Sequence, residues 1–270
     1  MLRRIARRLG AEWIARVPER PCRFKRDSPA VSFTFDDFPR SAWTTGGRIL
    51  EDAGYRGTYF VSAAFSPPRM RKEVPFGVIE GVRYYELEDL VQLYKRGHEL
   101  GCHSFDHLRV PGQAGSDIEL SIADNAEFVG QAIGRRLPLH SFAYPQGAVS
   151  LRTRKIVARH FSSCRGTSHG INSGRIDLSF LRAVSIDGLF DPGRSLPPII
   201  EEAKRRNGWL IFCAHDIERR PSRWGCTPTV FEEIVRQVRT ARMDVATIEQ
   251  LVPERSSLEA NGVLPDETDV

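Results

Sequence analysis

The sequence predicts an α/β fold in which parallel β-strands alternate with α-helices. Short apolar runs recur along the chain, and the longer segments between them carry apolar residues at i, i+3 and i+4 spacing. Strand–helix alternation implies parallel strands joined by right-handed crossovers. The chain has 270 residues, 41% of them hydrophobic, which is enough for one sizeable core and matches the usual size of a barrel.

The expected strands are the short apolar runs, and they lie near 30–35, 57–61, 98–102, 139–144, 160–164, 181–186, 209–214 and 243–247. The expected helices are the amphipathic segments between them, at 41–53, 86–96, 117–135, 149–158, 196–207 and 228–241. We expect three parts: a basic N-terminal segment, a catalytic body and an acidic tail, at 1–27, 28–250 and 251–270.

Two aspartates, Asp36 and Asp37, end the apolar run V-S-F-T-F. At a strand end, where the chain turns, neighbouring side chains can converge on one pocket. One carboxylate can then bind a cation while the other accepts a proton. Such a pair also occurs in solvated turns and near helix N-caps, so by itself it is a weak signal.

Two histidines, His103 and His107, follow in the segment H-S-F-D-H. Their spacing of four would put both imidazoles on one face of a helical turn, where they can share one ion. We interpret His98 and Glu99, at the other end of the preceding short strand, as structural and hydrogen-bonded. One carboxylate, two imidazoles, an open position and a nearby base are the minimum set for metal-assisted hydrolysis.

Four segments together resemble the ordered motifs of the polysaccharide deacetylase family, which is also called carbohydrate esterase family 4 or the NodB-homology family. They are F-T-F-D-D at 33–37, H-S-F-D-H at 103–107, F-A-Y-P-Q-G at 142–147 and C-A-H at 213–215. The similarity covers roughly 28–250 and extends to the exopolysaccharide and holdfast-adhesin deacetylases of bacteria. It implies a distorted (β/α)7 TIM-like barrel, and removal of N- or O-acetyl groups from sugars with a divalent metal, commonly Zn²⁺.

The resemblance also implies a role for individual residues. Asp36 matches the general base, whereas Asp37, His103 and His107 match the metal ligands. His215 matches the general acid, and Asp187 matches the aspartate that orients it. The backbone N–H of Gln146, in the segment Tyr144, Pro145 and Gln146, matches the oxyanion donor.

The sequence departs from the family at two positions. Ala143 stands where the third motif usually has an arginine that braces the base, and we hypothesise that Arg165 reaches across adjacent strands to replace it. A surface arginine that merely ends a strand is the competing interpretation. Gly188 stands where an aromatic residue often follows the fourth-motif aspartate, so the pocket for the acyl methyl group must be lined differently.

The chemistry follows from these residue types. A bound divalent metal would lower the pKa of a water molecule to about 7, and Asp36 would accept its proton. His215 would then protonate the departing amine. Because an amide needs such an acid more than an ester does, the combination of base and acid favours N-deacetylation.

The first 26 residues carry nine Lys/Arg and two Glu, a net charge of +7, whereas 27–270 carries 30 basic and 32 acidic residues. An apolar stripe runs through the basic segment at helical spacing, formed by Leu2, Ile5, Leu9, Trp13 and Val17. The pattern suits peripheral contact with an anionic membrane surface, packing against the barrel bottom, or a mitochondrial-type presequence. The slightly acidic body argues against a nucleic-acid partner.

Three loops are expected around the barrel mouth, at 65–85, 166–177 and 216–226. Their side chains could contact sugars or simply pack at the rim, and the candidates are Tyr84, Tyr85, His169, Asn172 and Trp224.

Five cysteines, an odd number, argue against a disulfide framework and favour a cytoplasmic location, peripheral at the inner membrane face.

The sequence therefore predicts a metal-dependent de-N-acetylase whose substrate is an N-acetylated glycan, either a bacterial polysaccharide or its lipid-linked precursor. Three alternatives stay open: a carbohydrate O-acetyl esterase, a barrel that binds carbohydrate without catalysis, and a membrane-associated scaffold that acts through its basic segment.

Overall fold

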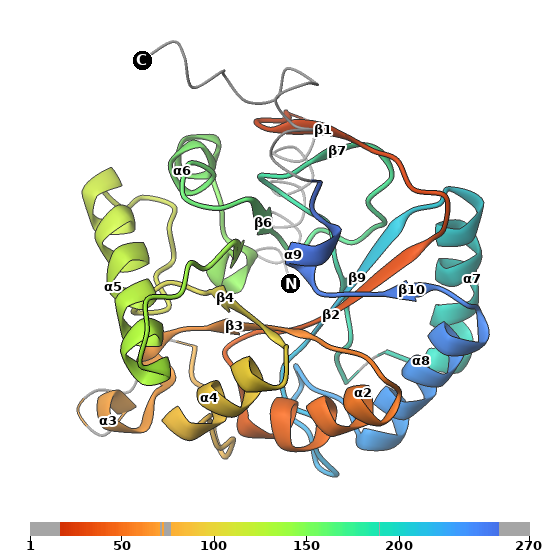
Figure 1. Ribbon diagram of the computed structural model, residues 1–270, viewed down its shortest axis with the longest axis horizontal. Coiled ribbons are helices and arrows are strands. Elements are labelled where there is room, and N and C mark those ends of the chain that lie inside the picture. The colour runs from red at the N-terminus through yellow and green to blue at the C-terminus, as the bar shows by residue number, and fades with distance from the viewer. Residues whose placement is uncertain (1–16, 71, 73–76, 189, 254–270) are drawn as a thin grey trace.

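A curled sheet of parallel strands forms the centre of the molecule, with helices around its outside (Figure 1). The computed structural model describes residues 17–70, 72, 77–188 and 190–253. Seven strands follow one another in the order β6 (Ser163–Arg165), β5 (Ser141–Ala143), β4 (Glu99–Cys102), β3 (Thr58–Val61), β2 (Ala30–Phe35), β9 (Trp209–Ala214) and β8 (Val184–Ser185). An eighth strand, β10 (Asp244–Val245), pairs with β2, and every pairing in this sheet is parallel.

The two edges of the sheet are linked by the segment between β6 and β9. Leu181 forms a parallel bridge with Arg165 on β6, and a few residues later Val184 pairs with Phe212 on β9. The strands therefore follow one another around a distorted barrel of seven, which confirms the predicted fold class. The strand predicted at 181–186 therefore contacts β6 through Leu181 and β9 through Val184.

Six amphipathic helices were predicted and each is present. The described helices are η1 (Ala42–Gly47), α2 (Arg48–Asp52), η2 (Ala63–Phe65), α3 (Pro67–Met70), α4 (Leu87–Lys95), α5 (Gly115–Ile133), η3 (Pro145–Gly147), α6 (Leu151–Val157), α7 (Pro192–Arg205), α8 (Pro228–Thr240) and α9 (Ile248–Leu251). The short helices η2, α3, η3 and α9 were not predicted. The predicted helix at 41–53 is divided into a π-helical turn and α2. Helix α7 starts four residues earlier than expected because the Asp191 side chain caps the N–H groups of Gly193 and Arg194.

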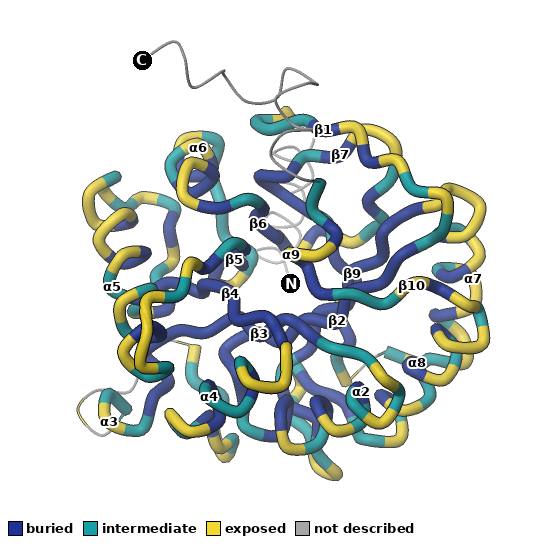
Figure 2. The backbone as a smooth tube through the Cα atoms, in the orientation of Figure 1, coloured by how far each residue is buried: buried dark blue, intermediate teal, exposed yellow. Residues whose placement is uncertain are grey.

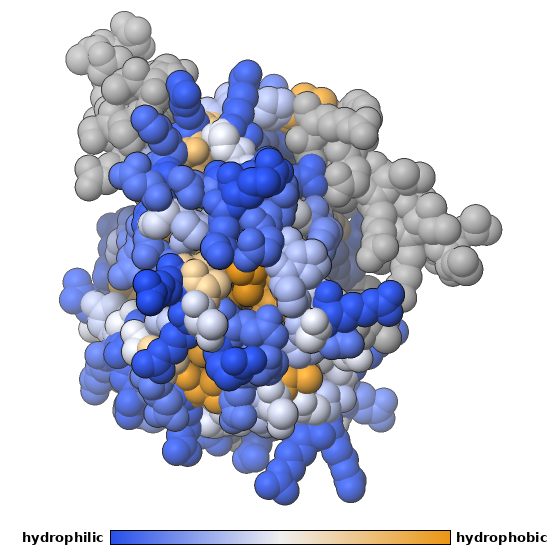
Figure 3. Space-filling view, turned by 90° about the vertical axis from the view of Figure 1, so that its right-hand side faces the viewer, coloured by the Kyte–Doolittle hydropathy of each residue, from blue (hydrophilic) through white to orange (hydrophobic). Residues whose placement is uncertain are grey.

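The central strands β2 and β9 are buried on both faces, as expected for a parallel sheet covered by helices (Figure 2). Aromatic side chains fill the space between β2 and the helices, where Phe33 stacks on Phe212 and Phe35 stacks on Tyr59. The outer faces of the helices are polar. Figure 3 shows the side of the molecule on which α7 and α8 lie in Figure 1, and apolar residues appear there only as small separate patches.

Two strands outside the barrel were not predicted. β1 (Pro21–Phe24) pairs antiparallel with β7 (Gly174–Asp177), and Phe24 stacks on Trp209 of the barrel. β1 therefore packs against the body of the protein, although it lies within 1–27, the range expected for a separate N-terminal segment. The predicted amphipathic helix lies almost entirely outside the described residues, as does most of the acidic tail. Within the described ranges, no helix is long and apolar enough to cross a membrane.

His98 is a buried structural residue at the amino end of β4, as expected. Its Nδ1 accepts a hydrogen bond from the Gly57 N–H at 3.0 Å, and its Nε2 lies 3.4 Å from Oε1 of Glu51. An Nδ1 that accepts a hydrogen bond carries no proton, so the imidazole is neutral. Burial lowers the pKa of His98 from 6.5 to about 4 even though Glu51 acts in the opposite direction.

This lowered pKa predicts that the protein loses stability as pH falls from about 6.5 towards 4. In that window the unfolded chain binds a proton at His98 that the folded chain does not, so acid favours unfolding, by at most about 3 kcal/mol. His98→Asn keeps an acceptor beside Gly57 but does not titrate. Its free energy of unfolding, measured in urea across this pH range, should decline less steeply than that of the wild type. Equal slopes would contradict the assignment.

Candidate active site

The candidate site lies at the carboxyl ends of β2, β4, β6 and β9. Asp36 and Asp37 follow β2, and both are about 5% exposed. Asp37 and Phe38 have φ angles of 60° and 53°, in the left-handed region. This turn breaks the alternation of strand side chains, and both carboxylates therefore face the same buried region.

The two histidines reach the same region from the loop after β4. Ser104 and His107 have φ angles of 61° and 50°, so the loop is not the helical turn that the spacing suggested. It is held in place because the Ser104 hydroxyl accepts a hydrogen bond from Leu108 N–H and the Ser62 hydroxyl accepts one from His107 N–H. The expectation of a shared helical face was wrong, but the loop brings the imidazoles together.

Asp37, His103 and His107 form a compact buried triad. Oδ1 of Asp37 lies 3.2 Å from Nε2 of each histidine, and one potential ligand atom from each residue lies within 4.8 Å of the others. Oδ1 nevertheless has no hydrogen-bond donor in suitable geometry, although the atom is fully buried. Three donor atoms that point at a common centre without bonding to one another are arranged as metal ligands are.

The residues fit a divalent metal such as Zn²⁺. Two imidazole nitrogens and one carboxylate oxygen are a frequent ligand set of catalytic zinc, which leaves a fourth position open. Nδ1 of His103 lies 2.7 Å from the carbonyl oxygen of Ala143, so Nδ1 carries the proton and Nε2 is free to bind. Ala143, at the position where the family usually has an arginine, thus orients His103 through its backbone carbonyl.

Apolar groups pack closely around His107. Its ring lies 5.1 Å from the ring of Phe65, measured between centroids. Gly77 lies on another side with a φ of 93°, and a Cβ atom there would be only 2.9 Å from the imidazole. Neither residue was predicted to belong to the site, because the sequence gives no signal that links them to His107.

The carboxylate of Asp36 is held on both oxygens. The guanidinium of Arg165 donates to Oδ1, and Sγ of Cys213 lies 3.4 Å from Oδ2. Arg165 is 1% exposed and also lies 5.0 Å from the centre of the Phe60 ring. In the sheet register Arg165 is the direct partner of Ala143, so an arginine on β6 occupies the place next to the position where the family usually has one.

The charges in this buried cluster compensate one another. Burial alone would raise the pKa of Asp36, but Arg165 and His103 outweigh it and hold that pKa below its usual value. The same holds for Asp37, whose pKa is lowered by His107 and His103 against the effect of burial. Both carboxylates are therefore ionised at neutral pH, as a base and a metal ligand must be.

His215 lies next to the other carboxylate oxygen of Asp37. Its Nε2 is 3.8 Å from Oδ2 of Asp37, and 20% of its side chain is exposed. Asp187 follows the end of β8, and His215 follows the end of the neighbouring strand β9. The pairing of these strands continues to Ile186, whose N–H donates to the carbonyl oxygen of Cys213. Trp224, on the loop after β9, lies 6.3 Å from His215 between ring centroids.

The backbone after β5 offers one hydrogen-bond donor. The hydroxyl of Tyr144 donates to the Ser179 carbonyl, its N–H donates to the Arg165 carbonyl, and Pro145 has no N–H. Gln146 has a φ of 58°, and no described group accepts its N–H. Of the three residues expected to serve substrate, only Gln146 therefore retains a donor.

Two of the expected sugar-contacting residues are unavailable for that role. Tyr85 is fully buried and its hydroxyl donates to the Ser62 carbonyl. Asn172 is 4% exposed and bonds to Arg182 and to the Trp209 carbonyl, at the amino end of β9. The loop at 166–177 does not surround the mouth along its whole length, because its last part forms β7. For Tyr85 and Asn172 the structure supports packing and not contact with sugars.

A family model described as polysaccharide deacetylase matches residues 24–161 of the chain. The chain belongs to the polysaccharide deacetylase family. The match covers about half of the sequence and includes the two aspartates and the histidines at 103 and 107. Arg165 and His215 lie beyond it. A search of the curated proteins gave no match.

Solved structures share this fold. The family 4 carbohydrate esterase PdaA of Bacillus subtilis has a TM-score of 0.54 and 13% identity over 85% of this chain and 82% of its own. The esterase domain of a multidomain xylanase from the hindgut metagenome of Trinervitermes trinervoides gives 0.54 and 16%, over 88% and 94%. A family 4 pseudoenzyme from Bacillus anthracis gives 0.53 and 14%, over 85% and 67%. Identities this low show similarity of fold alone.

The buried triad predicts that Zn²⁺ stabilises the folded protein. Zinc at about a hundred times its Kd should add about 2.7 kcal/mol to the free energy of unfolding. Asp37→Asn removes the anionic ligand and should abolish most of this gain, whereas His160→Ala, on an exposed histidine, should retain it. Thermal unfolding with and without zinc, together with metal content after dialysis, measures the effect. Unchanged zinc binding in Asp37→Asn would contradict the assignment.

The buried ion pair predicts a large loss of stability in Arg165→Gln. Removal of one partner leaves the other charge buried and unpaired, which costs about 3–5 kcal/mol. The double variant Arg165→Gln with Asp36→Asn should recover part of that loss because no unpaired charge remains. Denaturant unfolding in the presence of a chelator measures all three proteins. A cost below about 1 kcal/mol in the single variant, the level of an exposed pair, would refute the role of Arg165.

Proposed function

We propose that this chain is a metal-dependent de-N-acetylase of N-acetylhexosamine units in a glycan. The observation that carries the proposal is the position of Asp37, whose Oδ1 faces the imidazoles of His103 and His107 and whose Oδ2 lies 3.8 Å from Nε2 of His215. Asp36, beside it, is an ionised base that is not needed as a ligand. Membership in the polysaccharide deacetylase family supports the same reaction class.

Asp37, His103 and His107 would hold the metal. When bound, a divalent ion supplies polarisation of the acetyl carbonyl and lowers the pKa of a water molecule. Asp36 accepts the proton of the attacking water. Arg165 keeps this carboxylate ionised and fixes its orientation, so the base is ready before substrate arrives.

His215 acts as the acid. Its side chain is 20% exposed, against 2% for His103 and 3% for His107, so it is the histidine of the cluster that substrate can reach most easily. An amine cannot leave as an anion, so a proton must reach the nitrogen as the C–N bond breaks. Asp187, at the end of the adjacent strand, would orient this imidazole. The Gln146 N–H would donate to the oxygen on which negative charge develops, a contact of the kind worth about 3–4 kcal/mol.

We place the reaction in the cytoplasm, peripheral to the inner face of the membrane, on a bacterial polysaccharide or its lipid-linked precursor. The basic character of residues 1–26 supports this proposal. All five cysteines are buried and free, which suits a reducing compartment. Trp224 offers an aromatic surface beside His215 for a sugar ring.

Two further functions compete with this one. An O-acetyl esterase would use the same groups but depend less on His215, because an alcohol leaves more easily than an amine. A barrel that only binds carbohydrate is a precedented alternative, since one structure with this fold is a pseudoenzyme. The complete set of Asp36, Asp37, His103, His107 and His215 in one cluster favours catalysis.

Acetate release from chitooligosaccharides, measured with and without a chelator, tests the proposal. The wild type should release acetate only with metal, and Asp36→Asn should lower kcat by at least about a hundredfold, the usual contribution of a positioned base. His215→Ala should lower it to a similar degree on N-acetyl substrates and less on O-acetylated sugars.

His140→Ala is the matched control, since this half-exposed histidine pairs with Glu249 away from the site. Sugar binding without acetate release would favour the non-catalytic barrel. Release from O-acetyl but not N-acetyl sugars would favour the esterase. Neither binding nor release, with liposome binding that is lost on removal of 1–26, would favour a scaffold.

A further inference from the structure

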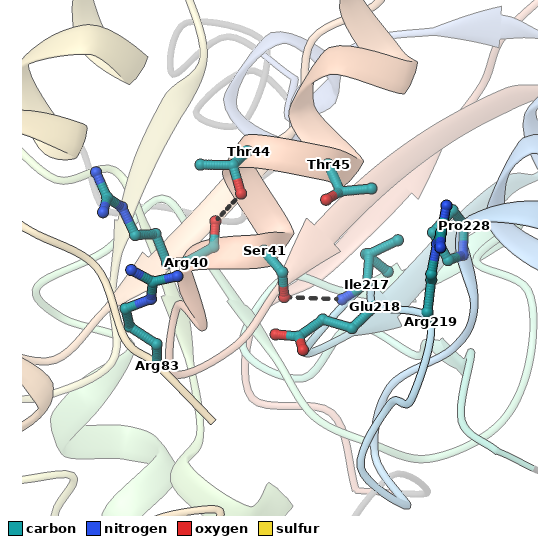
Figure 4. A pocket seen from close by; sticks show the side chains of 9 residues that line it. All are labelled: Arg40, Ser41, Thr44, Thr45, Arg83, Ile217, Glu218, Arg219 and Pro228. Carbon is teal, nitrogen blue, oxygen red and sulfur yellow. Dashed lines mark hydrogen bonds between the residues drawn. The ribbon is translucent and has the colours of Figure 1, made fainter. Parts of the chain in front are cut away.

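A second polar cavity opens next to the proposed active site. It has a volume of about 500 Å³, within the roughly 300–1,000 Å³ range of ligand pockets. Figure 4 shows its walls, which are formed by Arg40, Ser41, Thr44, Thr45, Arg83, Ile217, Glu218, Arg219 and Pro228. Almost all of these residues are polar, so the cavity is suited to a hydrophilic ligand.

The cavity is built from the same loops as the active site. Its residues 40 and 41 follow Asp37 after a short turn, and its residues 217–219 are separated from His215 by one residue. The two loops are joined because the Ile217 N–H donates to the Ser41 hydroxyl at 3.2 Å. On the third side, Arg83 precedes Tyr84, whose ring stacks on Phe65 and so reaches the His107 side of the site. A chain-like substrate in the active site therefore has this cavity next to it.

The charged groups of the cavity differ in their partners. Arg40 is paired with Asp89 at 2.8 Å. Within the described parts of the chain, by contrast, no ion pair or hydrogen bond involves the guanidinium groups of Arg83 and Arg219 or the carboxylate of Glu218. In Figure 4, Arg83 and Arg219 stand on opposite sides of the cavity, and Glu218 extends between them towards Arg83. Two exposed guanidinium groups thus face a space that also holds the Glu218 carboxylate, and none of these three charged groups forms an ion pair among the described residues.

We propose that this cavity binds an anionic group carried by the substrate next to the acetylated unit. The proposal rests on the deacetylase function proposed above and extends it to the substrate class. Guanidinium groups bind carboxylates and phosphates with charge-assisted, often paired hydrogen bonds. Glu218 and the hydroxyls of Thr44 and Thr45 suit sugar hydroxyls in the same cavity. The ligand class is therefore an acidic saccharide, with a uronate carboxylate or a sugar phosphate as the anion.

The test compares three acetylated probes at physiological salt. Chitotetraose is neutral, a hyaluronan tetrasaccharide carries carboxylates, and UDP-N-acetylglucosamine carries a diphosphate. The double variant Arg83→Ala/Arg219→Ala should lower kcat/KM by about tenfold for at least one anionic probe, the scale expected for lost charge-assisted bonds. Chitotetraose should change by less than about twofold. The anionic probe that is affected identifies the source of the anion.

The double variant Arg220→Ala/Arg239→Ala is the matched control. It removes the same charge from exposed positions, one beside the cavity residue Arg219 and one at the far end of α8. It should leave all three probes unchanged. An equal loss in both double variants would show general electrostatic attraction and overturn the proposal, as would unchanged kinetics of the Arg83/Arg219 variant on both anionic probes.

Binding separates this proposal from the proposed function. If no probe releases acetate, calorimetric titration of the intact protein with the two anionic probes still measures the cavity. Binding that is weakened about tenfold in Arg83→Ala/Arg219→Ala but not in the control supports the site even without deacetylation. Equal binding by the wild type and this variant overturns it, whatever the enzyme does with chitotetraose.

Discussion

A single buried oxygen, Oδ1 of Asp37, determines how the rest of the site is arranged. It faces two imidazole nitrogens at 3.2 Å and has no hydrogen-bond donor of its own. A buried carboxylate in that state costs free energy unless positive charge balances it. The left-handed turn at Asp37 and the irregular loop of His103 and His107 both bring their potential ligand atoms to this point. The strained local backbone is therefore explained by the electrostatic centre that it builds.

Arg165, beside the proposed base Asp36, shows how a functional group can be supplied from a neighbouring strand of the sheet. Arg165 and Ala143 are direct partners on neighbouring parallel strands, so a side chain from either strand can reach the same side of Asp36. A long arginine on β6 performs the pairing, and the small Ala143 leaves room and uses its carbonyl to orient His103. The pairing of β5 with β6 therefore allows an arginine on either strand to balance the negative charge of Asp36.

The sequence was sufficient for those parts of the structure that follow from periodicity and order. The barrel strands were predicted because burial on both faces gives continuous apolar runs, and the long helices because burial of one face imposes a repeat of 3.6 residues. β1 and β7 were missed because each is short and only partly apolar, and their pairing joins residues about 150 positions apart. Cys213 and Gly77 were missed for a similar reason. Their contacts with Asp36 and His107 depend on tertiary structure, and no local pattern marks them.

The barrel places the proposed reacting groups and the groups that would select a substrate on different kinds of structure. Asp36, Asp37, Arg165 and His215 are at or directly after strand ends, which the sheet register fixes to within small distances. Arg83, Glu218 and Arg219 belong to loops, and their charged ends have no partners among the described residues. A rigid centre can thus perform one reaction, while exchange of a few loop residues changes which glycan enters it. The separation also explains why family resemblance predicts the reaction class of this chain more readily than its substrate.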